Sequence, residues 1–422
     1  MRPLSILRSS AIFVLFLMSA CGAPEESLES SEISAGIAMR EEVVGVQILD
    51  DPFIWLEEVE SDDALAWAAE QNALSIPKLQ GDPRFETIRS EIEAVLTSED
   101  RIPSGSLVNG NVYNFWQDND HIRGILRRTS LESYAGDSTQ WETVLDIDEL
   151  ANIESANWVY KGRTCLPSNP SRCLIHLSDG GKDAVSIREF DLDLANFIDG
   201  GFFVGEAKTN IDWVDANTLL VGSDFGDGSL TTSGYARTLR LWRRGTALEN
   251  AEQIIEVGVE DMSVGTFTVM GEDSDFSFIV RRPDFFTEET WLMTEQGIIA
   301  KLPLQIDANF QGVLGQRVLV LLRSDWTLDD GETYAAGSLV SLDLAGSITA
   351  QAPVGISTVL NPRTDDQLDA ISGVGITGGS VYITALKDVA GMLLRVRPDA
   401  DGWEVTRIEL PENGDIRIIS TD

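Results

Sequence analysis

The chain has 422 residues, and its 69 acidic and 31 basic side chains give a formal net charge of −38. A surface this acidic repels phosphate backbones and anionic lipid headgroups, which argues against nucleic-acid binding. Hydrophobic residues make up 43 % of the chain, enough for a sizeable core and too many for a disordered protein. The length suits two ordinary domains or one large repeat domain.

Residues 1–20 are typical of an export signal. Arg2 and Arg8 precede an apolar run that is too short to anchor the chain across a bilayer. Small residues then lead directly into Cys21, a pattern that resembles the bacterial lipoprotein signal, in which this cysteine is lipidated and becomes the mature N-terminus. Gly22 rather than Asp follows, so the resemblance implies an exported outer-membrane lipoprotein of the cell envelope, facing the periplasm and touching the membrane only through its lipid. An ordinary cleaved signal with an incidental cysteine is the alternative.

The next part of the chain predicts a tether and then a helical extension. Residues 21–46 are rich in Ser and Glu and poor in large apolar side chains, which indicates a flexible tether. Residues 47–108 carry two helical patterns. Ser61 suits the N-cap of the first, which should end or kink near Pro77.

The second helix should open at Asp82-Pro83, because Asp suits an N-cap and Pro the first turn. Its apolar residues recur at helical spacing, so this helix should pack against something. They are Phe85, Ile88, Ile92, Val95 and Leu96.

From Asn109 onward, short apolar runs alternate with Gly- and Asp-rich turns, as in antiparallel strands and hairpins. Six units of three or four strands can be counted, and a seventh begins at 414–419 and stops. The six are 110–148, 157–193, 209–257, 266–304, 310–350 and 370–410.

A repeat of about 40–60 residues is that of propeller blades. The expected fold class is therefore an all-β propeller of the seven-bladed type, with about six blades plus a partial seventh and a short N-terminal helical segment. The propeller should occupy residues 109–422 and be incomplete. A pair of β-sandwiches is the alternative, but it would not usually need this many evenly spaced strands.

Two cysteines follow Cys21, and LPSNPSR separates them: Cys165 and Cys173. An exported chain meets an oxidising compartment, and a Pro-containing turn can bring the ends of a hairpin together. We therefore expect a disulfide between them, with two unrelated buried thiols as the alternative.

Several stretches, in order, resemble the prolyl oligopeptidase family of serine peptidases. They include DPFIWLEE (51–58), DPRF (82–85), YNFWQD (113–118), RGILRRT (123–129), LSDGGKDA (177–184), REFD (188–191), SGY (233–235) and WRRG (242–245). The similarity covers about residues 50–422. Members of this family join a seven-bladed propeller to an α/β-hydrolase domain, and the propeller caps the active site and admits short peptides. The resemblance therefore implies, as partners, a peptide substrate or a separate hydrolase domain.

No catalytic residue is expected in this chain. Serine hydrolysis in the family's fold requires a nucleophile in a G-x-S-x-G turn, then an acid, then a late His. The nearest match, Gly378-Gly379-Ser380, leads straight into a strand. The two histidines of the sequence, His121 and His176, precede every plausible nucleophile, and we interpret them as an exposed turn residue and a packed strand residue.

No metal and no cofactor are expected either. Two isolated histidines cannot supply the His pairs of a hydrolytic zinc site. The Asp-rich turns lack the calcium-loop spacing that ends in Glu, and hairpin turns need Asp and Gly in any case. The arginines after Trp242, Arg243 and Arg244, are interpreted as rim residues that pair with nearby acids.

Two functions remain. The first is the N-terminal, substrate-gating propeller part of a secreted prolyl-oligopeptidase-like serine endopeptidase or oligopeptidase, inactive alone because its hydrolase domain is lost or encoded separately. The alternative is a stand-alone propeller lipoprotein that binds peptide or protein in the cell envelope. The unfinished seventh unit and the apolar face of the second helix favour the first, because both leave apolar surface or strand edges exposed.

Overall fold

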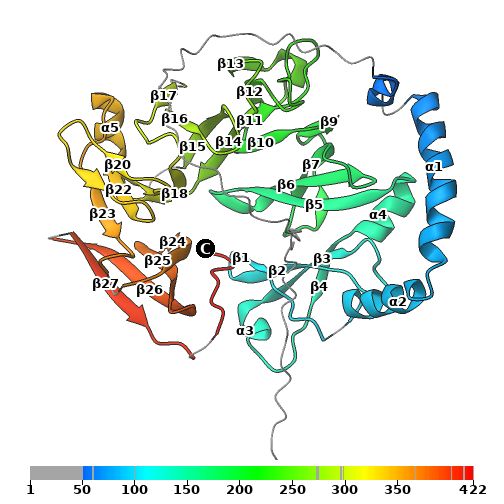
Figure 1. Cartoon of the computed structure of the whole chain (residues 1–422), viewed down its shortest axis with the longest axis horizontal. Coiled ribbons are helices and arrows are strands. Elements are labelled where there is room, and N and C mark those ends of the chain that lie inside the picture. The colour runs from blue at the N-terminus through cyan, green and yellow to red at the C-terminus, as the bar shows by residue number, and fades with distance from the viewer. Residues whose placement is uncertain are drawn as a thin grey trace, which may run out of the picture. The chain divides into compact units, whose positions relative to one another are not determined.

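The structure is a computed structural model of the chain (Figure 1). It describes residues 51–421 apart from 59–60, 99, 272–274, 295–296, 298, 366, 401 and 412–413. The predicted signal, the predicted lipidation site Cys21 and the predicted tether lie outside the described residues. The chain divides into two units, Met1–Pro83 and Arg84–Asp422.

The first unit contains the 3-10 helix η1 (Ile54–Glu57) and the helix α1 (Asp62–Gln80). Ser61 caps α1 as predicted, because its hydroxyl accepts a hydrogen bond from the Ala64 N–H at 3.3 Å. The helix continues beyond Pro77 to Gln80, since a proline removes only one N–H donor and this one lies in the last turn.

The second unit opens with α2 (Phe85–Leu96). This helix begins two residues later than the predicted Pro83 start, and no side chain caps it. Its apolar residues are not packed as expected: Ile88, Ile92 and Val95 are 50 %, 53 % and 68 % exposed. Among the helices that the structure describes, none is both long enough and apolar enough to cross a bilayer.

The rest of the second unit is a ring of six antiparallel sheets, which are the blades of a β-propeller (Figure 1). Blade one has β1 (Ser106–Val108), β2 (Asn111–Trp116), β3 (Ile125–Ser130) and β4 (Glu142–Asp146). Blade two has β5 (Trp158–Leu166), β6 (Asn169–Asp179), β7 (Val185–Asp191), β8 (Asn196–Phe197) and β9 (Phe203–Ala207). Blade three has β10 (Asn210–Asp215), β11 (Thr218–Gly222), β12 (Thr238–Arg243) and β13 (Glu252–Glu256).

Blade four has β14 (Ser263–Val269), β15 (Phe276–Arg282), β16 (Glu289–Met293) and β17 (Ile299–Lys301). Blade five has β18 (Asn309–Leu314), β19 (Arg317–Leu321), β22 (Leu339–Asp343) and β23 (Ser357–Leu360), and blade six has β24 (Ala370–Thr377), β25 (Ser380–Lys387), β26 (Ala390–Asp399) and β27 (Gly402–Ile408). A small sheet joins β20 (Trp326–Thr327) to β21 (Thr333–Tyr334). The short helices are α3 (Leu131–Tyr134), α4 (Ile147–Glu154), η2 (Leu248–Asn250) and α5 (Leu344–Ala350).

The core is distributed between the blades. Five clusters of buried apolar residues each join two successive sheets. Alternation along a strand explains this arrangement, because neighbouring side chains point to opposite faces of a sheet. In β11, Leu219 packs with blade two, whereas Leu220 packs with blade four.

The six sheets coincide with the six predicted units to within a few residues, except that blade two extends to Ala207 and blade five to Leu360, so the propeller prediction is confirmed. The first strand begins at Ser106 rather than after 108. Residues 414–419, where a seventh unit was predicted to begin, form no strand. Ile418 instead packs against Gly375 of blade six, and Ser420 Oγ accepts a hydrogen bond from the Leu107 N–H of blade one at 3.0 Å.

One face of the ring carries the longer loops. Because adjacent strands are antiparallel, the loop after the second strand of a blade lies on the face where the first strand begins. We call this the starting face. Its loops include 117–124, 180–184, 223–237, 283–288 and 322–338.

Candidate functional site

A pocket of about 370 Å³ opens on the starting face, where the first strands of blades three and four begin. We call it the mouth pocket. It is lined by Asp183, Lys208, Thr209, Asn210, Tyr235, Ala236, Met262, Ser263, Val264, Gly265 and Arg282. Sequence reasoning missed it, because its residues come from blades two, three and four and share no spacing.

Side chains of β10 fix the two strands at the base of this pocket. Asn210 Oδ1 accepts a hydrogen bond from the Thr266 N–H at 2.6 Å, and Asp212 Oδ2 accepts one from the Thr268 N–H at 3.0 Å. The Thr268 hydroxyl donates in turn to the Trp213 carbonyl at 2.6 Å. β10 and β14 belong to different sheets and have no backbone pairing with each other. These hydrogen bonds join them instead and hold the base of the mouth pocket in place.

The carboxyl of Asp212, in the contact between β10 and β14, has a shifted pKa. Burial raises the pKa of its carboxyl to about 6, although hydrogen bonds from the backbone of Trp213 and Thr268 oppose that shift. A buried carboxylate is costly because it loses hydration. Asp212 therefore holds its proton to a higher pH than an ordinary aspartic acid does, at the junction of blades three and four.

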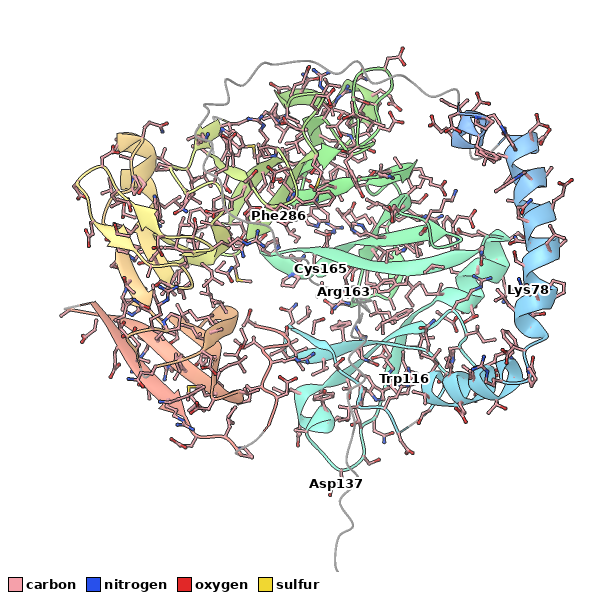
Figure 2. The ribbon with its side chains drawn as sticks, in the orientation of Figure 1. Lys78, Trp116, Asp137, Arg163, Cys165 and Phe286 are labelled. Atoms are coloured by element: carbon pink, nitrogen blue, oxygen red, sulfur yellow. A yellow bond between two sulfur atoms is a disulfide. The ribbon has the colours of Figure 1, made fainter. Side chains whose placement is uncertain are left out.

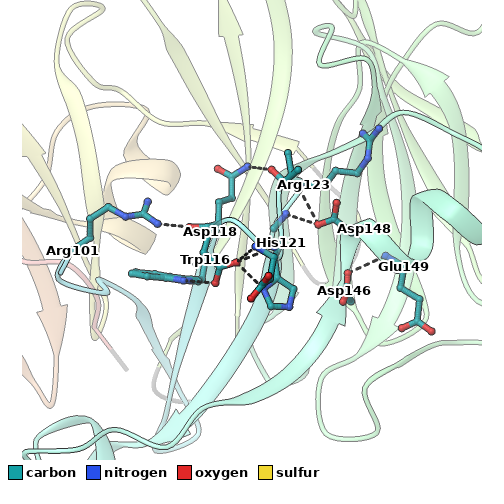
Figure 3. A network of polar contacts seen from close by, with 12 residues as sticks. Arg101, Trp116, Asp118, His121, Arg123, Asp146, Asp148 and Glu149 are labelled. Carbon is teal, nitrogen blue, oxygen red and sulfur yellow. Dashed lines mark hydrogen bonds and ion pairs between the residues drawn. The ribbon is translucent and has the colours of Figure 1, made fainter. Parts of the chain in front are cut away.

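The two histidines have separate environments. His121 lies in loop 117–124, where its Nδ1 is 2.9 Å from Asp118 Oδ1, and it is partly rather than fully exposed (Figure 3). Asp118 also accepts a hydrogen bond from Trp116 Nε1 at 3.1 Å. Burial raises the pKa of Asp118, but the bonds from the backbone and side chain of His121 outweigh it, so the pKa lies below its usual value. This carboxylate organises the turn.

His176 is a packed residue of β6, as the sequence predicted. Its Nε2 lies 3.1 Å from the Thr164 hydroxyl of β5. Burial lowers the pKa of His176 to about 4, so it is neutral at physiological pH. No bond joins His176 to His121 or to Ser380 among the described residues, and neither histidine stands beside a strained serine turn.

A stack of cations and indole rings ties blade one to the segment before it. The guanidinium carbons of Arg101 and Arg127 lie 4.4 and 4.2 Å from the ring centre of Trp116. Arg127 also lies 4.3 Å from the ring centre of Trp141. Burial lowers the pKa of Arg127 to about 10, and the charge of Arg101 adds to this effect. Sequence reasoning missed the stack, because it depends on which strands pair and in which register.

Cys165 and Cys173 face each other across β5 and β6, and their sulfur atoms lie 1.99 Å apart, as a disulfide (Figure 2). The disulfide links the two strands of the β5–β6 hairpin of blade two. Arg163 of the same strand reaches blade one, where its Nη2 donates to Ser106 Oγ at 2.5 Å.

Arg244 pairs with an acid, as the sequence predicted. Its guanidinium donates to both carboxylate oxygens of Glu189, at 2.8 and 2.9 Å. Arg172 Nε lies 3.1 Å from the same carboxylate, and the Phe202 N–H donates to it at 2.8 Å. The Glu189 side chain is fully buried, so this cluster is an ionic tie between blades two and three.

The six-bladed ring and its starting face define a β-propeller domain. The prolyl oligopeptidase N-terminal β-propeller domain family matches residues 38–422. The chain therefore belongs to that family.

The relatives are peptidases of greater length. The chain is 33 % identical over 380 residues to the uncharacterized peptidase y4nA of Sinorhizobium fredii, covering 88 % of this chain and 52 % of that protein. It is 29 % identical over 362 residues to the uncharacterized peptidase RP174 of Rickettsia prowazekii, covering 83 % and 50 %. A post-proline cleaving enzyme from Rickettsia typhi has a similar structure, with a TM-score of 0.76, 28 % identity and coverage of 85 % of this chain and 53 % of that one. The chain thus spans about half the length of the relatives it matches.

Proposed function

We propose that this chain is the propeller part of an exported serine endopeptidase or oligopeptidase and controls which substrates reach the active site of an α/β-hydrolase domain. The observation that carries this proposal is its match to about half of two peptidases. The sequence has no G-x-S-x-G turn, so the nucleophile would come from the other half. The chain alone should therefore be inactive.

Exposed apolar residues support a partner domain. Phe285 and Phe286, in loop 283–288 of the starting face, are 82 % and 74 % exposed. In α2, Ile92 and Val95 are also more than half exposed. Adjacent exposed apolar side chains are typical of surfaces that bind another protein. The hydrolase domain is the occupant we propose for the starting face, and a short peptide would pass between the two.

The coding DNA that follows codon 422 tests the partner directly. In one of the three translation frames, we expect this DNA to encode G-x-S-x-G, then an acid, then a His. An unrelated gene there would contradict the gating proposal and leave a stand-alone peptide-binding propeller of the envelope.

A second experiment tests whether the chain is inactive alone. The purified chain is incubated with a fluorogenic Pro-containing peptide, with an intact prolyl peptidase as the positive control. We expect no turnover. Hydrolysis that a serine-directed inhibitor abolishes would contradict the proposal.

We also propose that the chain is exported and lipidated at Cys21. The Cys165–Cys173 disulfide supports export, because structural disulfides persist in oxidising compartments. Cells fed a clickable palmitate analogue should label the wild-type chain and not Cys21→Ser. Equal labelling of both chains would remove the lipoprotein assignment.

A further inference from the structure

We propose that the mouth pocket binds a carboxylate of the peptide, either an acidic side chain or a free C-terminus, through Lys208 and Arg282. The inference rests on the proposed function, because it requires a peptide at the starting face. It adds a charge preference that the family membership does not supply.

Lys208 brings an unpaired ammonium group to the pocket. Its Nζ lies 4.8 Å from the ring centre of Tyr235, and no carboxylate pairs with it among the residues that the structure describes. Other basic residues near this face are paired: Lys182 with Glu206, Arg237 with Glu256, and Arg281 with Asp261 and Glu289. With 69 acidic side chains in the chain, a partly buried lysine without an acid beside it is unexpected.

Arg282 supplies the second cation from the end of β15. It forms a long ion pair with Glu288, whose Oε2 lies 3.9 Å from Nε, too far for a hydrogen bond. The guanidinium lies over Gly265, where an ideal Cβ would be 3.4 Å from Nη1. The glycine therefore leaves room for the guanidinium at the pocket wall.

Asn210 completes a set of donors. Its Oδ1 accepts from the Thr266 N–H, and Asn210 is one of the residues that line the pocket, so its amide N–H groups add donors to the set. Asp183, which is exposed at the rim, is the one carboxylate among the residues that line the pocket. An ammonium, a guanidinium and an amide around one cavity match the acceptor-only chemistry of a carboxylate.

The size and surroundings of the pocket limit what it can hold. A volume of about 370 Å³ holds one side chain with its adjoining backbone, at the low end of ligand sites in proteins. A neutral side chain in the same place would cover the Lys208 ammonium and the Arg282 guanidinium without bringing a carboxylate to either. The pocket should therefore reject neutral peptides as well as favour acidic ones.

The test measures binding of fluorescein-labelled octapeptides to the full chain by fluorescence anisotropy. One peptide carries Glu and an amidated C-terminus, a second replaces Glu with Gln, and a third carries Gln with a free C-terminal carboxylate. We expect at least one carboxylate-bearing peptide to bind about 2–5-fold more tightly than the neutral one, the range of a partly exposed charge contact. Comparison of the first and third peptides tells which carboxylate the pocket takes.

Three variants at the pocket and one control variant localise the effect. Lys208→Met and Arg282→Gln should each remove most of the preference, and Lys208→Arg should keep it. Arg397→Gln removes an equal charge from blade six, where Arg397 pairs with Glu404, and should change nothing. Thermal unfolding of each variant checks that the fold is intact.

The outcomes separate this inference from the proposed function. If neutral and acidic peptides bind equally well, the carboxylate site is wrong and peptide binding stands. If Arg397→Gln weakens acidic peptides as much as Lys208→Met, the preference is a general charge effect and the site is again wrong. If no peptide binds, the proposed function itself is contradicted.

Discussion

At the scale of single residues, Asp212 makes folding sensitive to pH. Its pKa is about 6 in the folded chain against an ordinary value of 3.8, so the folded state holds this proton more tightly than the unfolded state. The stabilisation is complete below pH 3.8 and is lost as the pH rises through 6. The difference corresponds to about 3 kcal/mol at most.

Asp212→Asn should remove the loss of folding free energy that occurs as the pH rises, because an amide does not ionise. Urea unfolding of the wild-type chain and of this variant between pH 4 and pH 8 measures that loss. His176 acts in the opposite direction, since burial lowers its pKa to about 4 and its contribution is lost as the pH falls through that value. The difference between the two chains therefore isolates Asp212, and identical pH profiles would show that its carboxyl is not buried in solution.

Residues were predicted well where the local pattern decides their setting. His176 was placed in a packed strand because apolar neighbours surround it in sequence, and Arg244 was expected to pair because acids are abundant. The partners themselves, Thr164 and Glu189, were not predicted, because they depend on strand pairing and on contact between blades. The mouth pocket escaped prediction for the same reason: Lys208 and Arg282 meet only when the ring forms.

At the scale of elements, the β5–β6 hairpin carries the disulfide. The cysteines are separated by 8 residues, and a loop of that length corresponds to a stabilisation of about 2–3 kcal/mol. We expect a reducing agent to lower the free energy of unfolding by that amount.

Urea unfolding with and without dithiothreitol measures the effect of the disulfide. The double variant Cys165→Ala, Cys173→Ala is the control and should not respond to the reductant. A thiol titration of the unreduced, denatured protein should detect neither Cys165 nor Cys173. Two free thiols at these positions would contradict the disulfide.

Element ends were less predictable than element types. The cap at Ser61 was found because its side chain acts on its own helix. The end of α1 near Pro77 was also predicted, and the helix runs only to Gln80, because one missing donor does not outweigh the rest of the last turn. Residues 414–419 have the composition of a strand, yet they pack on glycines of blade six without joining a ladder.

At the scale of the whole molecule, the blades were predictable because each is a local repeat, whereas the ties between them were not. Glu189 is such a tie. Glu189→Gln leaves Arg244 and Arg172 without their carboxylate, and we expect a loss at the low end of about 3–5 kcal/mol, because both arginines are partly exposed.

The exposed pair of Arg397 and Glu404 provides the matched control. Glu404→Gln should change the free energy of unfolding little, because water solvates both partners. Chemical denaturation of the two variants makes the comparison. Equal losses would mean that the buried tie contributes no more than a surface pair.

The closure of the ring has a consequence for the order of folding. Most pairing joins strands that are neighbours in sequence, so each blade can form early and as the chain is synthesised. The bond between Leu107 and Ser420 joins residues 313 positions apart and must wait for all six blades. A contact between residues so far apart in sequence costs the conformational entropy of the whole intervening segment. We therefore expect the contact between blades six and one to form last during folding.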